Sequence, residues 1–295
     1  MSLNKEMLVK IRSVFRMLAM AFALCLAFLG IAAPATAQSI CGATGTIPID
    51  SGRYIYQQDE WNSTLKQCAT VSGAGFTLTT ANFNTPTNGG PATYPSIFRG
   101  CHWGICTSSN PFPIKESEIA SASTSVSITQ PSGLQNDAAY DIWFNQAPAT
   151  AEQPDGTEIM IWINHQGAVQ PAGSRVAEAT IDGAKYDVWI GAGSSWKIVS
   201  YVAATPVTSV KNLNLLPFFA DSISRGSLKA SWYLIDVEFG FEVWSGGNGL
   251  AVSGFSVSAA AVSGKGGSAS AAAALSLPAS SSRQQPPPIR TESKI

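Results

Sequence analysis

Strict alternation of apolar and polar residues is the feature of this sequence that most constrains its fold. It runs through Thr157–Asn164 and Val237–Trp244 and, more briefly, through Tyr140–Phe144. Successive side chains of a β-strand point to opposite faces of the sheet, so each segment predicts a strand with one buried face. The residues expected to face inward are Ile159, Ile161, Ile163, Val237, Phe239, Phe241, Val243, Tyr140, Ile142 and Phe144.

Other short apolar segments lie between Gly, Pro, Asn and Ser, and they are expected to be strands as well. A helix is expected only for Leu215–Arg225, where Pro217 suits the first turn and Gly226 suits the end. Many strands with one short helix predict an all-β fold, a two-sheet antiparallel sandwich or jelly roll. The further strand candidates are Gly52–Gln58, Phe76–Thr80, Ser123–Thr129, Tyr186–Ile190, Ile198–Ala203 and Leu250–Ser258.

The two ends of the chain differ in composition from residues 38–262. In residues 1–37, basic residues precede the apolar run Met17–Ala33, and Ala35-Thr36-Ala37 has the small-x-small pattern of a cleavage site. This predicts a signal peptide; the alternative is an uncleaved membrane anchor, for which an apolar run of about 17 residues is the minimum. Residues 263–295 are rich in Ala, Ser and Pro and lack aromatic residues, which predicts a disordered tail.

Composition and charge exclude several classes of function. Hydrophobic residues make up 45% of the chain and charged residues 13%, which excludes a disordered polyelectrolyte. Without the four basic residues and one acidic residue of positions 1–37, the chain holds 14 basic and 18 acidic residues, so nucleic-acid binding is not indicated. The only histidines are His102 and His165, and neither a metal site nor a cofactor is expected. The mature protein is expected to be secreted (extracellular or periplasmic), monomeric and free of the membrane.

The cysteines are interpreted in the light of export. Removing the signal peptide would remove Cys25 and leave four cysteines, an even number that suggests two disulfides with three possible connectivities. The short spacing favours Cys101–Cys106, which leaves Cys41–Cys68. A zinc site is the alternative, but neither pair has the CxxC spacing.

Three of the expected strands carry a carboxylate and a tryptophan on the face opposite the aliphatic core. An ordinary solvent-exposed face would carry Thr, Ser and Lys. Indole rings can stack on sugar rings, and a pair of carboxyl groups is what glycoside hydrolysis requires. The alternative is a second hydrophobic layer of tryptophans with the acids at strand ends. The pairs are Asp141 with Trp143, Glu158 with Trp162, and Glu242 with Trp244.

Several motifs resemble glycoside hydrolase family 12, the small endoglucanases, in its bacterial branch. The resemblance covers nearly all of residues 41–257. GTEIMIWIN followed by GFEVW is the most specific part of it. The motifs are TYPSIFRGCHWGIC (Thr93–Cys106), AAYDIWF (Ala138–Phe144), GTEIMIWIN (Gly156–Asn164), QPAGS (Gln170–Ser174) and SWYLIDVEFGFEVWSGGNGLAVSGFSV (Ser231–Val257).

The resemblance implies a β-jelly roll with an open concave substrate cleft and a retaining double displacement. Glu158 matches the family's nucleophile and Glu242 its general acid/base. Asp141 matches a third carboxylate, which is expected to be protonated when it donates a hydrogen bond to Glu158. Glu238 lies on the same face as Glu242 but about 13 Å along the strand, so it is predicted to be a surface or subsite residue.

The resemblance also implies substrate contacts. For Trp61 and Trp103, aromatic packing at the sheet edge is the alternative. Bacterial members commonly have Asn where this chain has Asp59, which puts the hydrogen bonding of the distal subsite in question. His102 is predicted to make a structural or subsite hydrogen bond, and the resemblance supports both disulfides. The residues that match substrate-contacting positions are Trp61, Trp103, Met160, Trp162, Pro171 and Trp244.

Together these observations predict a catalytic domain at 38–262 that cleaves internal β-1,4 bonds of cellulose and mixed-linkage β-glucan. A xyloglucan-specific endo-β-1,4-glucanase is the alternative within the same class. A glucan-binding jelly roll without activity is the alternative outside it, and it would keep the tryptophans but lose at least one of the glutamates.

Overall fold

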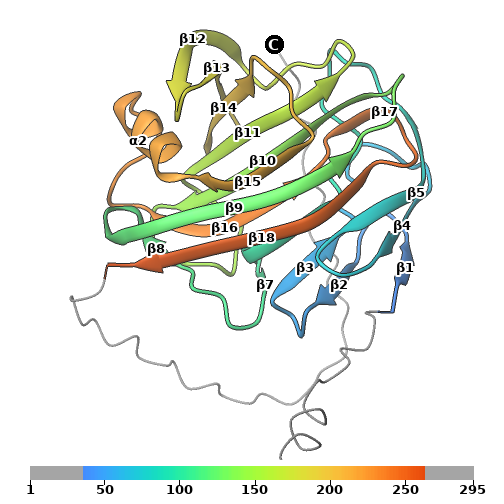
Figure 1. Ribbon diagram of the computed structural model, residues 1–295, viewed down its shortest axis with the longest axis horizontal. Helices are drawn as coiled ribbons and strands as arrows, with labels where there is room; N and C mark the ends of the chain where they lie inside the picture. Colours follow the sequence, from blue (N-terminus) through green and yellow to red (C-terminus); the bar gives the residue numbers. More distant parts are fainter. Residues whose placement is uncertain (1–35, 263–295) are drawn as a thin grey trace, which may run out of the picture. The chain divides into compact units, whose positions relative to one another are not determined.

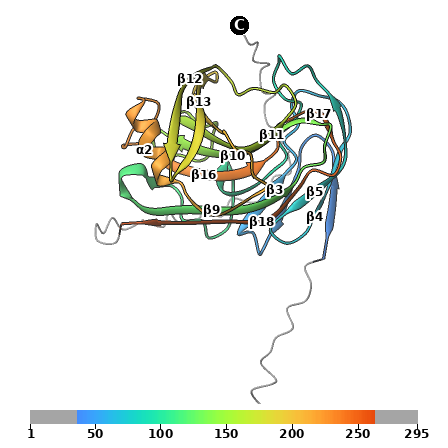
Figure 2. The same ribbon diagram turned by 45° about the horizontal axis from the view of Figure 1, so that its top comes forward.

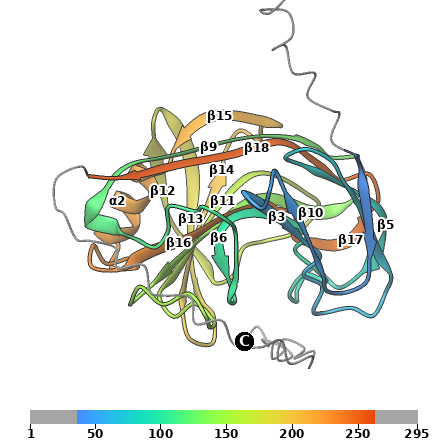
Figure 3. The same ribbon diagram turned by 90° about the horizontal axis from the view of Figure 1, so that it is seen from below.

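Two β-sheets lie face to face in this protein, whose computed structural model describes residues 36–262. Figure 3 shows the layers edge-on, with β9, β15 and β18 in one layer and β3, β6, β10 and β16 in the other. Residues 1–35 of the predicted signal peptide and the predicted tail at 263–295 lie outside the described residues. The all-β prediction is confirmed.

The first sheet has the strand order β1-β4-β5-β18-β9-β15, and all its pairings are antiparallel. Its two longest strands, β9 and β18, run side by side across the front of the molecule (Figure 1). The strands are β1 (Gln38–Cys41), β4 (Gln67–Val71), β5 (Phe76–Asn84), β9 (Ile119–Thr129), β15 (Ser209–Asn214) and β18 (Ala251–Ala261).

The second sheet has the order β2-β3-β6-β16-β10-β11-β14-β13-β12. Its pairings are antiparallel except β11 with β14, which run parallel. Three short strands complete the fold: β7 (Ile105–Cys106) beside β6, β8 (Ile114–Lys115) beside β16, and β17 (Val243–Gly247) between β10 and β5. The strands of this order are β2 (Thr46–Ile49), β3 (Tyr54–Gln57), β6 (Ser96–His102), β10 (Gln135–Asn145), β11 (Thr157–Gln166), β12 (Ser174–Ile181), β13 (Ala184–Ala192), β14 (Lys197–Ala203) and β16 (Tyr233–Gly240).

The core lies between the two sheets, where the alternation of the sequence placed it. Every residue predicted to face inward from the three alternating segments is buried there. Side chains such as Leu78 and Val126 contribute the facing layer from the first sheet. The alternation directs one set of side chains of β10, β11 and β16 into this core and the other set to the opposite face of the sheet, which carries the acidic residues and tryptophans.

The helix α2 (Leu216–Ser224) agrees with the prediction to within one residue at each end. It lies beside β13 and β14 (Figure 2), where Phe218 makes edge-to-face ring contacts with Tyr186 and Tyr201. Residues 36–262 contain a further 3-10 turn, η1 (Glu116–Glu118). No helix in this range has the length and apolar character needed to cross a membrane.

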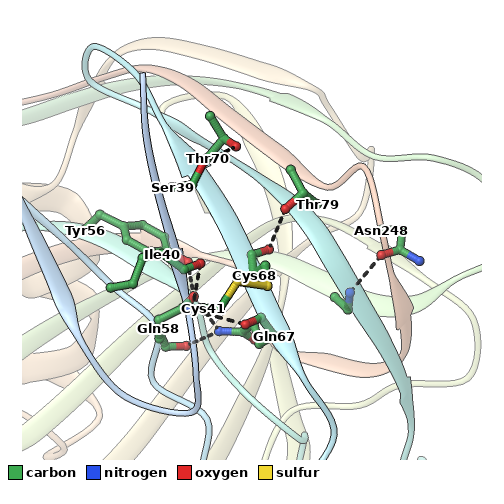
Figure 4. Close-up of a disulfide and its surroundings, with 11 residues drawn as sticks. Ser39, Ile40, Cys41, Tyr56, Gln58, Gln67, Cys68, Thr70, Thr79 and Asn248 are labelled. Atoms are coloured by element: carbon green, nitrogen blue, oxygen red, sulfur yellow. Dashed lines mark hydrogen bonds between the residues drawn. A yellow bond between two sulfur atoms is a disulfide. The ribbon is translucent and has the colours of Figure 1, made fainter. Parts of the chain in front are cut away.

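Both expected disulfides form. Cys41–Cys68 links β1 to β4 across directly opposed positions (Figure 4), and Cys101–Cys106 closes the hairpin of β6 and β7. With all four cysteines paired, they are unavailable to bind zinc.

The segment Val237–Trp244 is not one continuous strand, contrary to the prediction. Strand β16 ends at Gly240 and β17 begins at Val243, which leaves Glu242 in the break. The Glu242 N–H donates to Asp137 Oδ1 at 3.0 Å, and the Asp137 N–H donates to the Glu242 carbonyl at 3.1 Å. The Glu242 N–H is therefore bonded to a side-chain oxygen and not to a backbone carbonyl of a neighbouring strand. Local breaks of this kind redirect a side chain, here that of Glu242.

Candidate active site

Strand β10 is central to the site because β11 pairs with one of its edges and β16 with the other. Asp141 lies opposite Met160 on β11 and opposite Glu238 on β16. Glu158 lies opposite Trp143, two positions farther along β10. Side chains two positions apart share a face, so the structure brings Asp141, Glu158 and Glu238 together on the face turned away from the core.

Asp141 is buried, and its pKa is raised well above its usual range. Burial is the largest cause, followed by the negative charges of Glu158, Glu238, Glu242 and Asp59. A carboxyl group surrounded by other carboxylates holds its proton, since ionisation would add a like charge at short range. The direction agrees with the expectation that Asp141 acts as a hydrogen-bond donor.

Asp137 is a member of the site that the sequence analysis missed. It is fully buried, lies four residues before Asp141 on β10 and hydrogen-bonds the backbone of Glu242. Burial, then the charge and side-chain hydrogen bond of Glu242, raise the Asp137 pKa well above its usual range. The signal for it was a second acidic residue on the strand that carries Asp141. Asp137 places the half-buried Glu242 beside Asp141.

Trp196 is the second residue that the sequence analysis missed. It immediately precedes β14, the parallel neighbour of β11, and its Nε1–H donates to Glu158 Oε2 at 2.6 Å. The signal for it was a tryptophan at the start of the apolar strand 197–203. The indole N–H can only donate, so the hydrogen bond favours the ionised form of the carboxyl group.

Three tryptophans form a cluster beside Glu158. Trp143 contacts Trp103 edge-on at 5.2 Å between ring centroids and Trp196 at 5.5 Å. Trp103 belongs to the hairpin closed by the Cys101–Cys106 disulfide and has a positive φ of 42°. Its ring remains half-buried, so part of it faces solvent beside the site.

His102, Asp236 and Glu238 form a buried ionic network on the same face of the second sheet. His102 Nδ1 contacts Glu238 Oε1 directly and lies 3.6 Å from Asp236 Oδ2. Burial opposes the charge on His102, but the two carboxyl groups outweigh it and raise the His102 pKa to about 10. Glu238 also accepts hydrogen bonds from Gln57 Nε2 at 3.0 Å and from Ser96 Oγ at 2.7 Å.

This network corrects the prediction for Glu238, which is completely buried and is not a surface residue. Burial favours its neutral form, but the His102 charge and the hydrogen bonds from His102, Asp236 and Ser96 outweigh burial and lower the Glu238 pKa. Burial and the Glu238 charge raise the Asp236 pKa well above its usual range. His102 has a structural role, as predicted.

The same three side chains are the group within residues 36–262 that could hold a metal ion, since their ligand atoms lie within 4.8 Å of one another. However, His102 contacts Glu238 directly, and Glu238 is further bonded by Gln57 and Ser96. A protonated His102, an ionised Glu238 and a protonated Asp236 balance the charge of the network internally. The donor set therefore fits an ion pair better than a metal centre.

The structure places three of the predicted substrate contacts in a small hydrophobic cluster. Met160, Trp162 and Trp244 pack together there and are each at most 3% exposed. Trp244 Nε1 also donates to the Gly89 carbonyl at 2.9 Å. Rings so covered have little surface for a sugar to stack on, and the substrate contacts of Trp162 and Trp244 stay a prediction. They form the second hydrophobic layer that was the alternative, and Met160 is enclosed with them.

The remaining predicted contacts lie in loops. Trp61 is half-buried, and its backbone N–H donates to the Ala92 carbonyl at 3.2 Å. Pro171 is buried just before β12. Asp59, also half-buried, has a positive φ of 42°. Burial raises the Asp59 pKa to about 6, with His102 opposing the shift and Glu238 adding to it. Asp59 is thus electrostatically linked to the ionic network.

A search against protein-family models matches residues 52–260 to Glycosyl hydrolase family 12. The chain belongs to this family. Within it, the chain is 38% identical over 144 residues to the Mycobacterium tuberculosis protein named probable cellulase Cel12b, a match that spans 49% of this chain and 94% of that protein. It is 34% identical over 137 residues to Endoglucanase A of Aspergillus kawachii, and spans 57% of that protein's length.

Solved structures agree with this assignment. Endoglucanase cel12A from Rhodothermus marinus superposes with a TM-score of 0.73 at 38% sequence identity, covering 76% of this chain and all of that one. Membership of family 12 confirms the resemblance inferred from the motifs, the jelly-roll fold and the assignment of the protein as a glycoside hydrolase.

Proposed function

We propose that this family 12 protein is a secreted endo-β-1,4-glucanase that cleaves cellulose and mixed-linkage β-glucan with retention of configuration. The observation that carries the proposal is the grouping of Asp141, Glu158 and Glu242, whose charges interact at one face of the second sheet. The cellulase and endoglucanase names of its relatives support the same class of substrate.

In this mechanism the two glutamates divide the work. Glu242 protonates the glycosidic oxygen as the bond to the anomeric carbon breaks, and Glu158 attacks that carbon to form a glycosyl–enzyme ester. Glu242 then removes a proton from water, which attacks the anomeric carbon, displaces the Glu158 carboxylate and releases the sugar with its original configuration. A protonated Asp141 beside Glu158 would stabilise the carboxylate as it leaves.

The surroundings support this division. Glu158 is held by a tryptophan N–H, which favours the ionised form that a nucleophile needs. Glu242 lies next to two buried acids, Asp137 and Asp141, and its charge is one of the causes that keep these two groups protonated. Among the predicted sugar contacts, the half-buried rings of Trp61 and Trp103 retain surface for stacking.

The direct test is the release of reducing ends by the full-length protein from carboxymethylcellulose, mixed-linkage β-glucan, xyloglucan and xylan. We expect cleavage of the first two, a rapid fall in viscosity that marks internal cuts, and a β-anomeric first product by proton NMR. Glu158→Gln is the inactive control. A strong preference for xyloglucan would replace the proposed substrate, and glucan binding without cleavage would indicate a binding module.

Export has a separate test. The proposed signal peptide ends at Ala37, so the mature protein should begin at Gln38. The two disulfides support an oxidising compartment, where such bonds persist. N-terminal sequencing of the protein recovered from the medium or periplasm decides the cleavage site, and light scattering of the same material tests the expected monomer.

A further inference from the structure

The contact between Trp196 and Glu158 gives the nucleophile a hydrogen-bond donor in addition to the one expected from Asp141. We propose that Trp196 is a positioning residue for the nucleophile: its indole N–H holds one carboxylate oxygen of Glu158 in a fixed orientation and stabilises the ionised group. The proposal rests on the proposed function, because it assumes that Glu158 is the attacking group.

The backbone on both sides fixes the position of Trp196. The Gly193 N–H donates to the Trp196 carbonyl at 3.0 Å and closes a tight turn, while the Lys197 N–H donates to the Gly156 carbonyl at 3.1 Å. A Cβ on Gly193 would lie 2.2 Å from Cε2 of the Trp196 ring, so the ring covers the glycine. The parallel register then sets Ile198 opposite Glu158, which brings the indole alongside that carboxylate.

The ring is also braced from the side. Trp143 contacts it at 5.5 Å and Trp103 at 6.4 Å between centroids, both at steep angles. Edge-to-face packing of this kind restricts rotation of the indole, so the direction of its N–H is set before substrate binds. The 2.6 Å distance to Glu158 Oε2 is short for an N–H···O hydrogen bond, in the direction expected for an ionised acceptor.

A comparison with neighbouring tryptophans distinguishes this contact from simple packing. Nε1 of Trp143 and of Trp162 are buried without a hydrogen-bond partner among the described residues. Trp244 donates to a backbone carbonyl. Trp196 is the tryptophan in this region whose N–H meets a carboxylate.

The electrostatic surroundings give this donor its importance. The carboxyl groups of Asp141 on β10, and of Glu238 and Glu242 on the β16 side, interact with one another close to Glu158. The positive charge of His102 on β6 is taken up by Glu238. From the β14 side, Lys197 Nζ is bonded to the Gly226 carbonyl. The Trp196 N–H is therefore a donor that supports the negative charge of Glu158 without an added cation.

The test compares Trp196→Phe with Trp143→Phe, which removes a buried indole N–H but keeps an aromatic ring against Trp196 and removes no hydrogen bond to a carboxylate. With an aryl β-cellotrioside as substrate, we expect Trp196→Phe to lower kcat about 10- to 100-fold with little change in KM. Its acidic limb in the pH profile of kcat/KM should move to higher pH, because the ionised nucleophile has lost a donor. Trp143→Phe should keep the acidic limb of the wild type.

A second variant and a spectrum complete the test. Trp196→His restores an N–H donor and should recover part of the lost kcat. In the wild-type protein, one indole N–H proton should resonate downfield in a ¹⁵N–¹H spectrum and should shift in Glu158→Gln, which measures the hydrogen bond even if Trp196→Phe does not fold. The proposal is overturned if Trp196→Phe matches Trp143→Phe in kcat and acidic limb, or if no indole resonance responds to Glu158→Gln. A wild type that cleaves no glucan would instead overturn the proposed function.

Discussion

The second sheet buries carboxyl groups in two regions and compensates them in different ways. In the ionic network of His102, Asp236 and Glu238, a cation neutralises the charge of Glu238. No cation is among the causes that raise the pKa values of Asp137 and Asp141, and these two carboxyl groups keep their protons instead. The first solution gives a fixed ion pair, which is stable over a wide pH range. The second leaves acids that can give up or accept protons, which is what hydrolysis requires.

The largest expected effect tests whether the region around Asp137 and Asp141 is the one that carries out hydrolysis. Glu242→Gln removes the proton donor next to Asp137, and it should lower kcat/KM on carboxymethylcellulose by about 10³-fold or more. Azide, which can attack the glycosyl–enzyme without a general base, should restore turnover on an aryl β-cellotrioside with a good leaving group. Wild-type rates in Glu242→Gln would place the acid elsewhere.

The next prediction compares the stability that depends on the ion pair of Glu238 with the stability that depends on the protonated Asp137. Glu238→Gln leaves the His102 charge buried without its partner and should lower the free energy of unfolding by about 3–5 kcal/mol at pH 7. Asp137→Asn, the matched acid-to-amide change in the protonated region, should cost about 1 kcal/mol or less, because the amide replaces a neutral acid. Urea unfolding followed by tryptophan fluorescence measures both. Equal losses would contradict the comparison.

The ionic network also has a pH signature. Because the folded-state pKa of His102 is about 10, above its unfolded value, its contribution is complete below about pH 6.5 and is lost as pH rises through 10. In Glu238→Gln this dependence should be reversed. The free energy of unfolding of the variant should rise with pH, since a buried histidine without its partner is better tolerated in the neutral form. His165→Ala, at the other histidine, is the control and should show neither effect.

A smaller effect concerns the protonation of Asp141. If its carboxyl group donates a hydrogen bond, Asp141→Asn keeps a neutral donor and should retain activity within about tenfold, whereas Asp141→Ala should lose about 100-fold. Initial rates on mixed-linkage β-glucan at the pH optimum of each variant provide the measurement. An Asn variant as weak as the Ala variant would mean that Asp141 acts as an anion.

The smallest effect lies between the two regions, at Asp59. Its pKa of about 6 is above the unfolded value, so ionisation between about pH 4 and pH 6 costs the folded state free energy. Asp59→Asn should therefore raise the free energy of unfolding by about 1 kcal/mol at pH 7 and leave it unchanged below pH 4. Thermal unfolding at the two pH values checks this. A gain that persists at low pH would point to a cause other than charge.

Local sequence patterns were enough to predict the inner face of the sheet and the helix. Alternation in Thr157–Asn164 assigned Ile159, Ile161 and Ile163 to the core, and Pro217 and Gly226 marked the ends of α2. Strand alternation and helix ends depend on residues that are close together in the chain, so a short stretch of sequence is enough to predict them. The motifs likewise identified the family, together with Glu158, Glu242 and Asp141 as its candidate acids.

Tertiary structure decided what each side chain on the outer face contacts. Trp162 lies on β11 and Trp196 lies beside it, yet the first is enclosed in a hydrophobic cluster and the second donates to Glu158. Glu238 and Glu242 are four residues apart, yet one pairs with His102 and the other is turned aside by Asp137. These outcomes depend on partners 38 to 181 residues away in the chain, Trp196 from Glu158 and Gln57 from Glu238 among them. Burial and charge compensation are set by such distant neighbours, which only the folded sheet brings together.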